Sequence, residues 1–386
     1  MPEIYSPQAM LEKLVAFDTV SHKSNLELIA FVEAYLASHG VEAHRVYNAD
    51  KTKASLHAFI GPQTDGGVVL SAHTDVVPVE GQTWCSDPFR LCEKGGKLFG
   101  RGSADMKGFA GTVLASVPDF LSADLRKPIH IALSYDEEVG CLGAPDMIAD
   151  MLRVGPLPQL AIVGEPSGMK TVTGHKGIIV LKTRVKGFPV HSSQLDRGVS
   201  AISIAARLIT WLDSKTLENR SRALPGCLFD PPYSTLHCGV ISGGCAHNIT
   251  AEYCDFTTDI RTLPEETGED WVALYRQFID TAVLPDMRRI SVMCDIELEE
   301  IANVPALKPE MDGPAEHLVR SLTGDNTENH VVFATEGGQF QNAGISTVVC
   351  GPGSIDQAHQ ADEYVEVSQI QDCAHFLKKL TQRLSD

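Results

Sequence analysis

The sequence predicts an α/β protein with two domains, one of them inserted into the other. Three observations support this fold class. The chain has 386 residues, which is long for a single hydrophobic core. Short apolar runs alternate with helical patterns in most of the chain, and residues 177–302 follow a different, β-α-β-β-α-β order.

The first domain is predicted from its buried strands and flanking helices. Residues 7–39 carry two helical patterns, and Gly40 ends the second. Runs that are apolar at nearly every position are typical of strands buried on both faces, which predicts helices on both faces of a mostly parallel sheet. Four such runs occur: VVLSA (68–72), IHIALSY (129–135), LAIVG (160–164) and STVVCG (346–351).

The inserted domain is predicted from the order of its elements. IIVLKTRVKG reads as a strand, AISIAARLITWLDS as a helix, TLHCGVISGG and CDFTTDIRT as strands, EDWVALYRQFI as a helix and IELEE as a last strand. This order is that of a ferredoxin-like unit. We therefore expect a discontinuous first domain, residues 1–176 and 303–386, and an inserted α+β domain, residues 177–302.

Charge and composition exclude several classes of protein. The 50 acidic residues outnumber the 32 basic ones, for a formal net charge of −18, which disfavours nucleic acid as a partner. The sequence shows no basic segment followed by a long apolar one at its start, and no apolar run long enough to cross a membrane. The ten cysteines are scattered and are expected to be reduced core thiols. These features predict a cytoplasmic protein without a membrane partner.

Metal-capable side chains follow each predicted strand of the first domain. Because the carboxyl ends of parallel strands meet at one edge of a sheet, residues far apart in the sequence can converge there. Each residue alone has an ordinary explanation, such as a solvated loop or the acidic first turn of a helix; the joint arrangement favours a site. The residues are His73 and Asp75, the run Asp136-Glu137-Glu138, Glu165 and His359, joined by Asp105 in the glycine-flanked loop FGRGSADMKG.

The number of ligands suits two zinc ions. One Zn²⁺ could take His73, Glu165 and one oxygen of Asp105. The other could take His359, Glu138 and the second oxygen of Asp105. A shared water would complete both coordination shells, as catalytic zinc requires. The same ligands also accept cobalt or manganese.

Two carboxylates then remain for other roles. Asp75 stands two residues from His73 and is expected to accept the second ring N–H of that histidine, which would fix its tautomer. Glu137 has no assigned metal and is the predicted general base.

Five segments in order resemble a known family. SAHTDVVP, GRGSADMKG, DEEVG, GEPS and AHQADEYV are similar to the metal-site motifs of the dinuclear-zinc aminoacylases and carboxypeptidases, which include acetylornithine deacetylases and succinyl-diaminopimelate desuccinylases. The resemblance covers nearly the whole chain. It implies a zinc-peptidase-like catalytic domain, a cis peptide after Asp105, and an inserted domain that acts as a lid and forms a homodimer. Phe109, where many members have glycine, is a departure that acetylornithine deacetylases tolerate.

The resemblance also implies roles for residues of the inserted domain. His191 would donate to the oxyanion, from its own subunit or from a partner, although a loop histidine before a helix is the ordinary alternative. Arg261 and Asn248 would hold the carboxylate of a small acyl-amino-acid substrate. A strand-end charge and a turn residue are their ordinary alternatives.

The substrate is the least constrained part of the prediction. Residues 333–365 are most similar to those of acetylornithine deacetylases, which implies hydrolysis of N2-acetyl-L-ornithine in arginine biosynthesis. Glu336 could bind the ornithine ammonium group, or it could be a loop cap without a ligand. A desuccinylase, an acetylcitrulline deacetylase, an aminoacylase or dipeptidase, and a non-catalytic metal or amino-acid binding module remain open alternatives.

Overall fold

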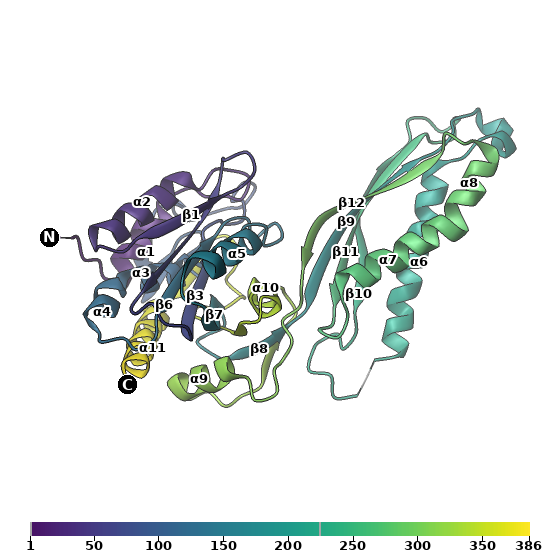
Figure 1. Cartoon of the computed structure of the whole chain (residues 1–386). Coiled ribbons are helices and arrows are strands. Elements are labelled where there is room, and N and C mark those ends of the chain that lie inside the picture. Colours follow the sequence, from purple (N-terminus) through teal and green to yellow (C-terminus); the bar gives the residue numbers. More distant parts are fainter. Residues whose placement is uncertain (1, 224) are drawn as a thin grey trace. The chain divides into compact units, whose positions relative to one another are not determined.

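The computed structural model describes residues 2–223 and 225–386, which form two compact units (Figure 1). The first unit extends to Gly174 and resumes over Leu307–His330 and Thr335–Asp386. The second unit comprises His175–Ala306 and Val331–Ala334. Among the helices of the described residues, none combines the length and the apolar character that crossing a membrane requires.

A mixed eight-stranded sheet forms the centre of the first unit. Its strand order is β1-β2-β6-β3-β7-β14-β8-β13. The four apolar runs predicted as strands are its four adjacent central strands, β6, β3, β7 and β14, and each neighbouring pair among them is parallel. The outer pairs β1–β2, β2–β6 and β14–β8 are antiparallel and were not predicted. The bounds are β1 Ala43–Tyr47, β2 Ala54–Ile60, β3 Gly67–His73, β6 Ile129–Ser134, β7 Pro158–Pro166, β8 Val172–His175, β13 Asn329–Val331 and β14 Ser346–Gly351.

Helices cover both faces of this sheet, which confirms the predicted fold class. One face shares a continuous apolar core with six helices: α1 Pro7–Val15, α2 Leu26–Ser38, α3 Lys107–Ala115, α4 Val117–Ser122, α9 Pro314–Thr323 and α11 Val367–Ser385. Both helices predicted within residues 7–39 are present. Gly40 follows the second with a positive φ of 79°, as expected of a helix stop.

The opposite sheet face carries both polar and apolar side chains and is contacted by α5 (Ala144–Val154) and α10 (Gly337–Asn342). The hydroxyl of Ser55 donates to the carbonyl of Gly143 at the start of α5, and His57 lies 2.9 Å from Asp150 within it. Buried polar groups are stable only with such partners. These contacts fix α5 on this face.

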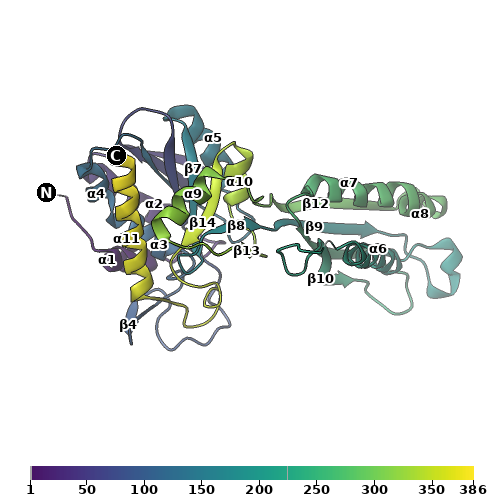
Figure 2. The same cartoon turned by 90° about the horizontal axis from the view of Figure 1, so that it is seen from below.

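A small antiparallel sheet completes the first unit. It consists of β4 (Cys92–Lys94), β5 (Lys97–Phe99) and β15 (Tyr364–Glu366), in the order β15-β5-β4. These three-residue strands are too short to give a sequence pattern, and they were not predicted. Figure 2 shows β4 near the lower end of α11 in that view.

The second unit is ferredoxin-like, as its element order predicted. Its four-stranded sheet has the order β10-β11-β9-β12, and all neighbours are antiparallel. Every second residue of β9 is buried against a core formed with the helices, while the alternate residues are partly exposed on the other sheet face. The bounds are β9 Gly177–Lys186, α6 Ala201–Ser221, β10 Thr235–Gly243, β11 Tyr253–Thr262, α7 Gly268–Phe278, α8 Leu284–Ile290 and β12 Asp295–Val304.

The prediction that the cysteines are core residues is only half right. The ten thiols are free, and five of them are buried. Cys85, Cys92 and Cys245 are exposed, and Cys227 and Cys238 are partly exposed. The exposed ones lie in loops or in the short strand β4, where the chain has no apolar layer to cover them.

His130 makes a testable contribution to the pH dependence of stability. It is buried in β6, its Nε2 has no hydrogen-bond partner in the described chain, and burial lowers its pKa to about 4. Above about pH 6.5 His130 is neutral in both the folded and the unfolded chain and does not affect stability. As the pH falls toward 4, the unfolded chain binds a proton that the folded chain does not, so stability is lost. We expect His130→Phe to remove about 2 kcal/mol of the stability lost between pH 7 and pH 4.5. Urea unfolding of both proteins at both pH values measures this; parallel pH profiles would contradict it.

Candidate metal centre

The carboxyl ends of the central strands bring the predicted ligands together. His73 is the last residue of β3, and Glu165 lies near the end of β7. Glu138 follows β6, and His359 lies in the loop after β14. Asp105 precedes α3, and the peptide between Asp105 and Met106 is cis, as the resemblance implied. The parallel order β6-β3-β7-β14 therefore gathers residues separated by up to 286 positions.

Asp105 lies between the two histidines. Its Oδ1 is 2.9 Å from Nε2 of His73, and its Oδ2 is 3.2 Å from Nε2 of His359. The same nitrogen of His359 is 2.9 Å from Oε2 of Glu138, and Nε2 of His73 is 3.7 Å from Oε1 of Glu165. Each histidine thus contacts one oxygen of the shared Asp105 and one carboxylate of its own.

These spacings fit metal ligands. Two atoms that are each 2.0–2.1 Å from a tetrahedral zinc are roughly 3.3 Å apart, and the four distances run from 2.9 to 3.7 Å. The donors are imidazole nitrogens and carboxylate oxygens, which suit zinc and related divalent ions. The residues present therefore fit the metal centre that the sequence predicted.

Crowded negative charge gives this cluster an affinity for cations. The carboxyl groups of Asp75, Asp105, Glu138 and Glu165 are each at most 7% exposed. Burial raises the pKa of Glu138 to about 7 and that of Glu165 well above its usual range, and neighbouring carboxylates add to both shifts. A divalent ion in their midst would stabilise the charged forms.

The pKa values of the two histidines are also raised, which favours their charged forms. Hydrogen bonds to Asp105 and Glu138 raise the pKa of His359 to about 10. Burial disfavours a charged His73, but Asp105 and Glu165 outweigh that effect and raise its pKa. Two imidazoles cannot offset a full negative charge on every carboxyl group, and the raised pKa values of Glu137, Glu138 and Glu165 reflect this crowding.

Glu137, the predicted general base, lies inside the same cluster. Ligand atoms of His73, Glu137 and Glu165 are all within 4.8 Å of one another, as are those of His73, Asp105 and Glu138. Burial raises the pKa of Glu137 well above its usual value. Its Oε1 accepts a hydrogen bond from the thiol of Cys141 at 3.3 Å. A carboxylate with a raised pKa beside a metal site is suited to accept and return a proton.

Asp75 does not act as predicted. The Nδ1 atom of His73 is 2.9 Å from the backbone carbonyl of Asp75, while the nearest carboxylate oxygen is 3.6 Å away. That carboxylate instead accepts hydrogen bonds from the hydroxyl of Ser21 and from the backbone N–H groups of Glu137 and Glu138. Asp75 therefore fixes the tautomer of His73 through its backbone and fixes the Glu137-Glu138 turn through its side chain.

Lys53, which was not predicted, supports this turn through Asp136. The Nζ of Lys53 donates to Oδ1 of Asp136 at 2.5 Å and also to the carbonyl of Ser21. Asp136 has a positive φ of 56°, an uncommon conformation for this residue type. Lys53 directly precedes a strand, and its sequence context does not distinguish it from a lysine that is exposed to solvent.

Glu336 is buried and bonded to two serines, which favours its alternative interpretation as a loop cap over a substrate contact. Its side chain spans two neighbouring strands: one oxygen accepts from the hydroxyl of Ser71 in β3 at 2.8 Å, and the other accepts from Ser134 in β6. The residue is 1% exposed and precedes α10. Both carboxylate oxygens are thus occupied, and the structure supports the alternative role of a loop cap.

The second unit carries the other three predicted site residues. His191 is exposed at the start of a 3₁₀ turn, Ser192–Arg197, and its Nδ1 accepts a hydrogen bond from the backbone N–H of Ser193. The N–H of Ser192 donates to the carbonyl of Asn248, so His191 and Asn248 lie on paired backbone segments. Arg261 is elsewhere in this unit, on β11.

Arg261 already has a carboxylate partner. Its Nε and one terminal nitrogen donate to the two oxygens of Asp259, at 2.8 and 3.1 Å. The pair is about one-third exposed. A substrate carboxylate would have to compete with Asp259 for this guanidinium.

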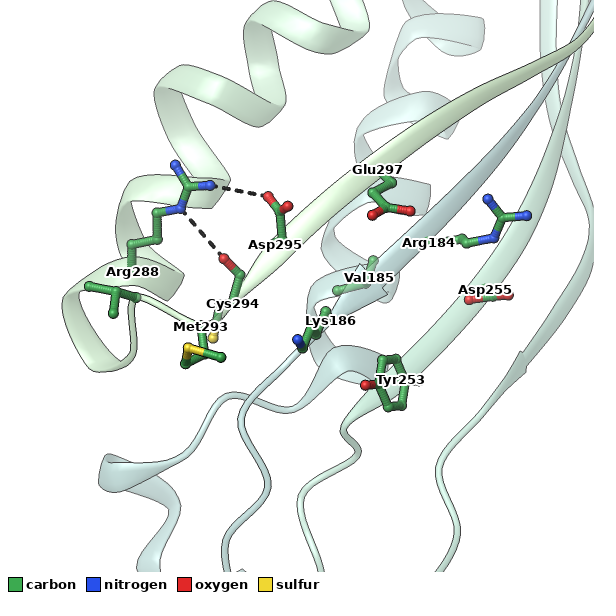
Figure 3. A pocket seen from close by; sticks show the side chains of 11 residues that line it. Arg184, Val185, Lys186, Tyr253, Asp255, Arg288, Met293, Cys294, Asp295 and Glu297 are labelled. Atoms are coloured by element: carbon green, nitrogen blue, oxygen red, sulfur yellow. Dashed lines mark hydrogen bonds and ion pairs between the residues drawn. The ribbon is translucent and has the colours of Figure 1, made fainter.

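A hollow of about 500 Å³ on the second unit is separate from these residues (Figure 3). It is lined by both ends of charged pairs, such as Arg288 with Asp295 at 3.1 Å. Arg184 on its wall is paired with Glu299. Within the described chain, none of the predicted site residues lines it. Arg184, Asp255, Arg288 and Asp295 on its wall thus each have a charged partner.

A cluster of buried carboxylates with one buried and one exposed histidine, at the carboxyl edge of a parallel sheet, is the arrangement of a metal-dependent hydrolase. The chain belongs to peptidase family M20/M25/M40, whose model matches residues 69–383.

Relatives and solved structures agree over nearly the whole chain. An acetylornithine deacetylase of Proteus mirabilis is 33% identical, covering 98% of this chain and 95% of its own. One of Erwinia tasmaniensis is 36% identical, covering 95% and 93%. The crystal structure of an M20 family metallo-carboxypeptidase from Sulfolobus solfataricus has the same fold, with a TM-score of 0.75 at 15% identity, covering 99% and 100%.

The structural role of Glu336 is testable by comparing two substitutions. Glu336→Gln keeps a side chain that can exchange hydrogen bonds with two hydroxyl groups, and we expect it to cost at most about 1 kcal/mol. Glu336→Met leaves Ser71 and Ser134 buried without this partner, and we expect a cost of about 2–4 kcal/mol. Urea unfolding measures both. A Met variant as stable as the wild type would show that Glu336 does not hold the two strands.

Proposed function

We propose that this chain is a dinuclear metal-dependent deacetylase that hydrolyses N2-acetyl-L-ornithine to L-ornithine and acetate. The observation that carries the proposal is the position of Asp105 between two histidines, each of which also contacts a carboxylate of its own. That geometry supports two neighbouring metal positions. The names of the relatives support the substrate.

Five residues would hold the two ions, with Asp105 shared between them. His73 and Glu165 would complete one position, and His359 and Glu138 the other. Zinc is the metal we propose, with cobalt as a substitute that the same donors accept. When bound, the ions would polarise the amide carbonyl and lower the pKa of water.

Glu137 would move the proton in this reaction. Its carboxylate lies among the ligand atoms, and burial raises its pKa, so it can take a proton from the attacking water. It can then return that proton to the leaving amine, whose expulsion as an anion would be unfavourable. The Asp75 carboxylate, which binds the N–H of Glu137, would keep this residue oriented.

His191 would stabilise the developing negative charge on the carbonyl oxygen. Nδ1 of its ring lies 3.3 Å from the backbone nitrogen and 2.9 Å from the hydroxyl of Ser193, and in the tautomer in which Nδ1 accepts from both, Nε2 carries the proton. The Nε2–H group is then available as a donor to an oxyanion. This tautomer is the feature of the second unit that supports the proposed role.

Arg261 and Asn248 would bind the carboxylate of the amino acid. The carboxylate of Asp259 binds the guanidinium of Arg261 at two points. A substrate carboxylate would use the same two-point geometry. With Glu336 buried, we assign no residue to the ornithine ammonium group. The choice of ornithine therefore rests on the relatives and not on a side chain of the site.

The second unit would also form a homodimer. β10 is an edge strand of its sheet, and Val240 and Ile241 on it are 65% and 53% exposed. An edge strand with exposed apolar residues is a surface that pairs readily with a second copy.

A substrate panel tests the proposed activity. Metal-replete protein should hydrolyse N2-acetyl-L-ornithine with the highest kcat/KM, at least about tenfold above the others. The comparison substrates are N-succinyl-L,L-diaminopimelate, N-acetyl-L-citrulline, N-acetyl-L-norvaline and a dipeptide. A higher value for any of these would replace ornithine in the proposal. Metal binding without hydrolysis of any of them would favour a binding module.

Glu137→Gln separates the general base from the metal ligands. We expect the variant to bind as much metal as the wild type and to lose about 10²–10⁴-fold in kcat, because the amide cannot accept the proton. Metal content and turnover are measured on the same preparation. Near-normal turnover would refute the role of Glu137 as base, and loss of metal would make it a ligand.

His191→Ala tests the oxyanion donor. A group that acts mainly in the transition state lowers kcat much more than it raises KM, and we expect that pattern here. Mixing His191→Ala with Glu137→Gln then tests whether His191 acts across a dimer, since hybrid dimers would regain turnover. Proven subunit exchange without recovery would place His191 in its own subunit.

A further inference from the structure

Glu363 is a buried carboxylate outside the predicted ligand set. It is 1% exposed and stands four residues after His359. All of its hydrogen-bond partners are donors, and three of the four are backbone N–H groups. Oε1 accepts from the N–H groups of Ala104 and Asp105, at 2.9 and 3.0 Å. Oε2 accepts from the N–H of Gly102 at 3.0 Å and from Arg101 at 2.7 Å.

Arg101 extends this contact to the loop of the second predicted histidine ligand. Its guanidinium is buried against Glu363, and its other terminal nitrogen donates to Oε1 of Gln82 at 2.5 Å. The amide nitrogen of Gln82 donates to the backbone carbonyl of His359 at 2.8 Å. The indole N–H of Trp84 also donates to Gln82, which fixes the orientation of its amide.

These contacts form one chain from the backbone of Asp105 to the backbone of His359. Glu363 holds the first loop and Gln82 holds the second, while Arg101 connects them. Each oxygen of the buried Glu363 carboxylate has two donors, while Nε of Arg101 is buried without a hydrogen-bond partner in the described chain.

We infer that Glu363 is a positioning residue that sets the separation of Asp105 and His359 before metal binds. The inference rests on the proposed function, in which both residues are metal ligands. Glu363, Arg101 and Gln82 would then hold the metal ligands in place without contacting the metal or the substrate themselves. Outer residues that orient ligands commonly change metal affinity 10–100-fold when they are replaced.

The position requires a carboxylate and not merely a polar group. Four donors converge on two oxygens. Glutamine has a single acceptor oxygen, so its NH₂ group would face two donors in either orientation. Glu363→Gln therefore removes at least two of the four hydrogen bonds and leaves Arg101 without its counter-charge.

The test is the Zn²⁺ affinity of the metal-free protein, measured by competition with a chromophoric chelator. We expect wild-type protein to bind two ions, and Glu363→Gln to bind the weaker ion about 10–100-fold less tightly. Glu310→Gln is the matched control: Glu310 accepts from Ser346 and Gln341 in the same unit, and does not contact the proposed ligands. Its Zn²⁺ affinities should equal those of the wild type.

Thermal unfolding of the metal-free proteins separates positioning from stability alone. If Glu363→Gln lowers the melting temperature but binds both ions as tightly as the wild type, Glu363 is only structural and the inference is overturned. Failure of wild-type protein to bind Zn²⁺ would instead refute the proposed metal centre itself.

Gln82→Met keeps the inference testable if Glu363→Gln does not fold. Gln82 is partly exposed, so the substitution disturbs packing little while removing the bond to the His359 carbonyl. We expect a weaker loss of Zn²⁺ affinity than the 10–100-fold of Glu363→Gln, confined to one ion. Unchanged affinity for both ions in this variant would overturn the inference.

Discussion

Buried negative charge at the carboxyl edge of the central sheet is the constraint on which the site depends. Carboxylates that are almost wholly removed from water repel one another, and burial together with this repulsion raises the pKa of Glu138 and Glu165. Two imidazoles offset part of this charge. Divalent cations would offset the rest. Holding these carboxyl groups together therefore lowers the stability of the fold, and bound cations would compensate for their repulsion.

The parallel topology makes this crowding possible. Four adjacent strands run in the same direction, so every loop that leaves their carboxyl ends arrives at one edge. The strands themselves are apolar and buried, and their sequence pattern predicted them. The outer strands are antiparallel, shorter or partly exposed, and a short pattern such as that of β13 carries little information.

The sequence predicted which residues gather at the site, but not which way the side chains of Asp75 and Glu336 point. The positions of His73, Asp105 and Glu138 near strand ends predicted that they lie together, and in the structure their ligand atoms are within 4.8 Å of one another. The same reasoning assigned the Asp75 carboxylate to the ring of His73 and Glu336 to a substrate. In both cases the side chain turns toward donors in segments distant in sequence, Ser21 for Asp75 and Ser71 for Glu336. No local pattern encodes a partner 54 or 265 residues away.

The partners of each carboxylate explain why some are candidate ligands and others are not. Both oxygens of Asp75, of Glu336 and of Glu363 accept from hydroxyl, backbone N–H or guanidinium donors, which partly or fully satisfy them without a cation. The partners that the structure shows for Asp105, Glu138 and Glu165 are imidazoles, which can themselves bind metal. A carboxylate surrounded by donors holds the fold, whereas one that faces only histidines and other carboxylates remains available to an ion. On this criterion the buried acidic residues divide into a cluster that binds and a surrounding layer that positions it.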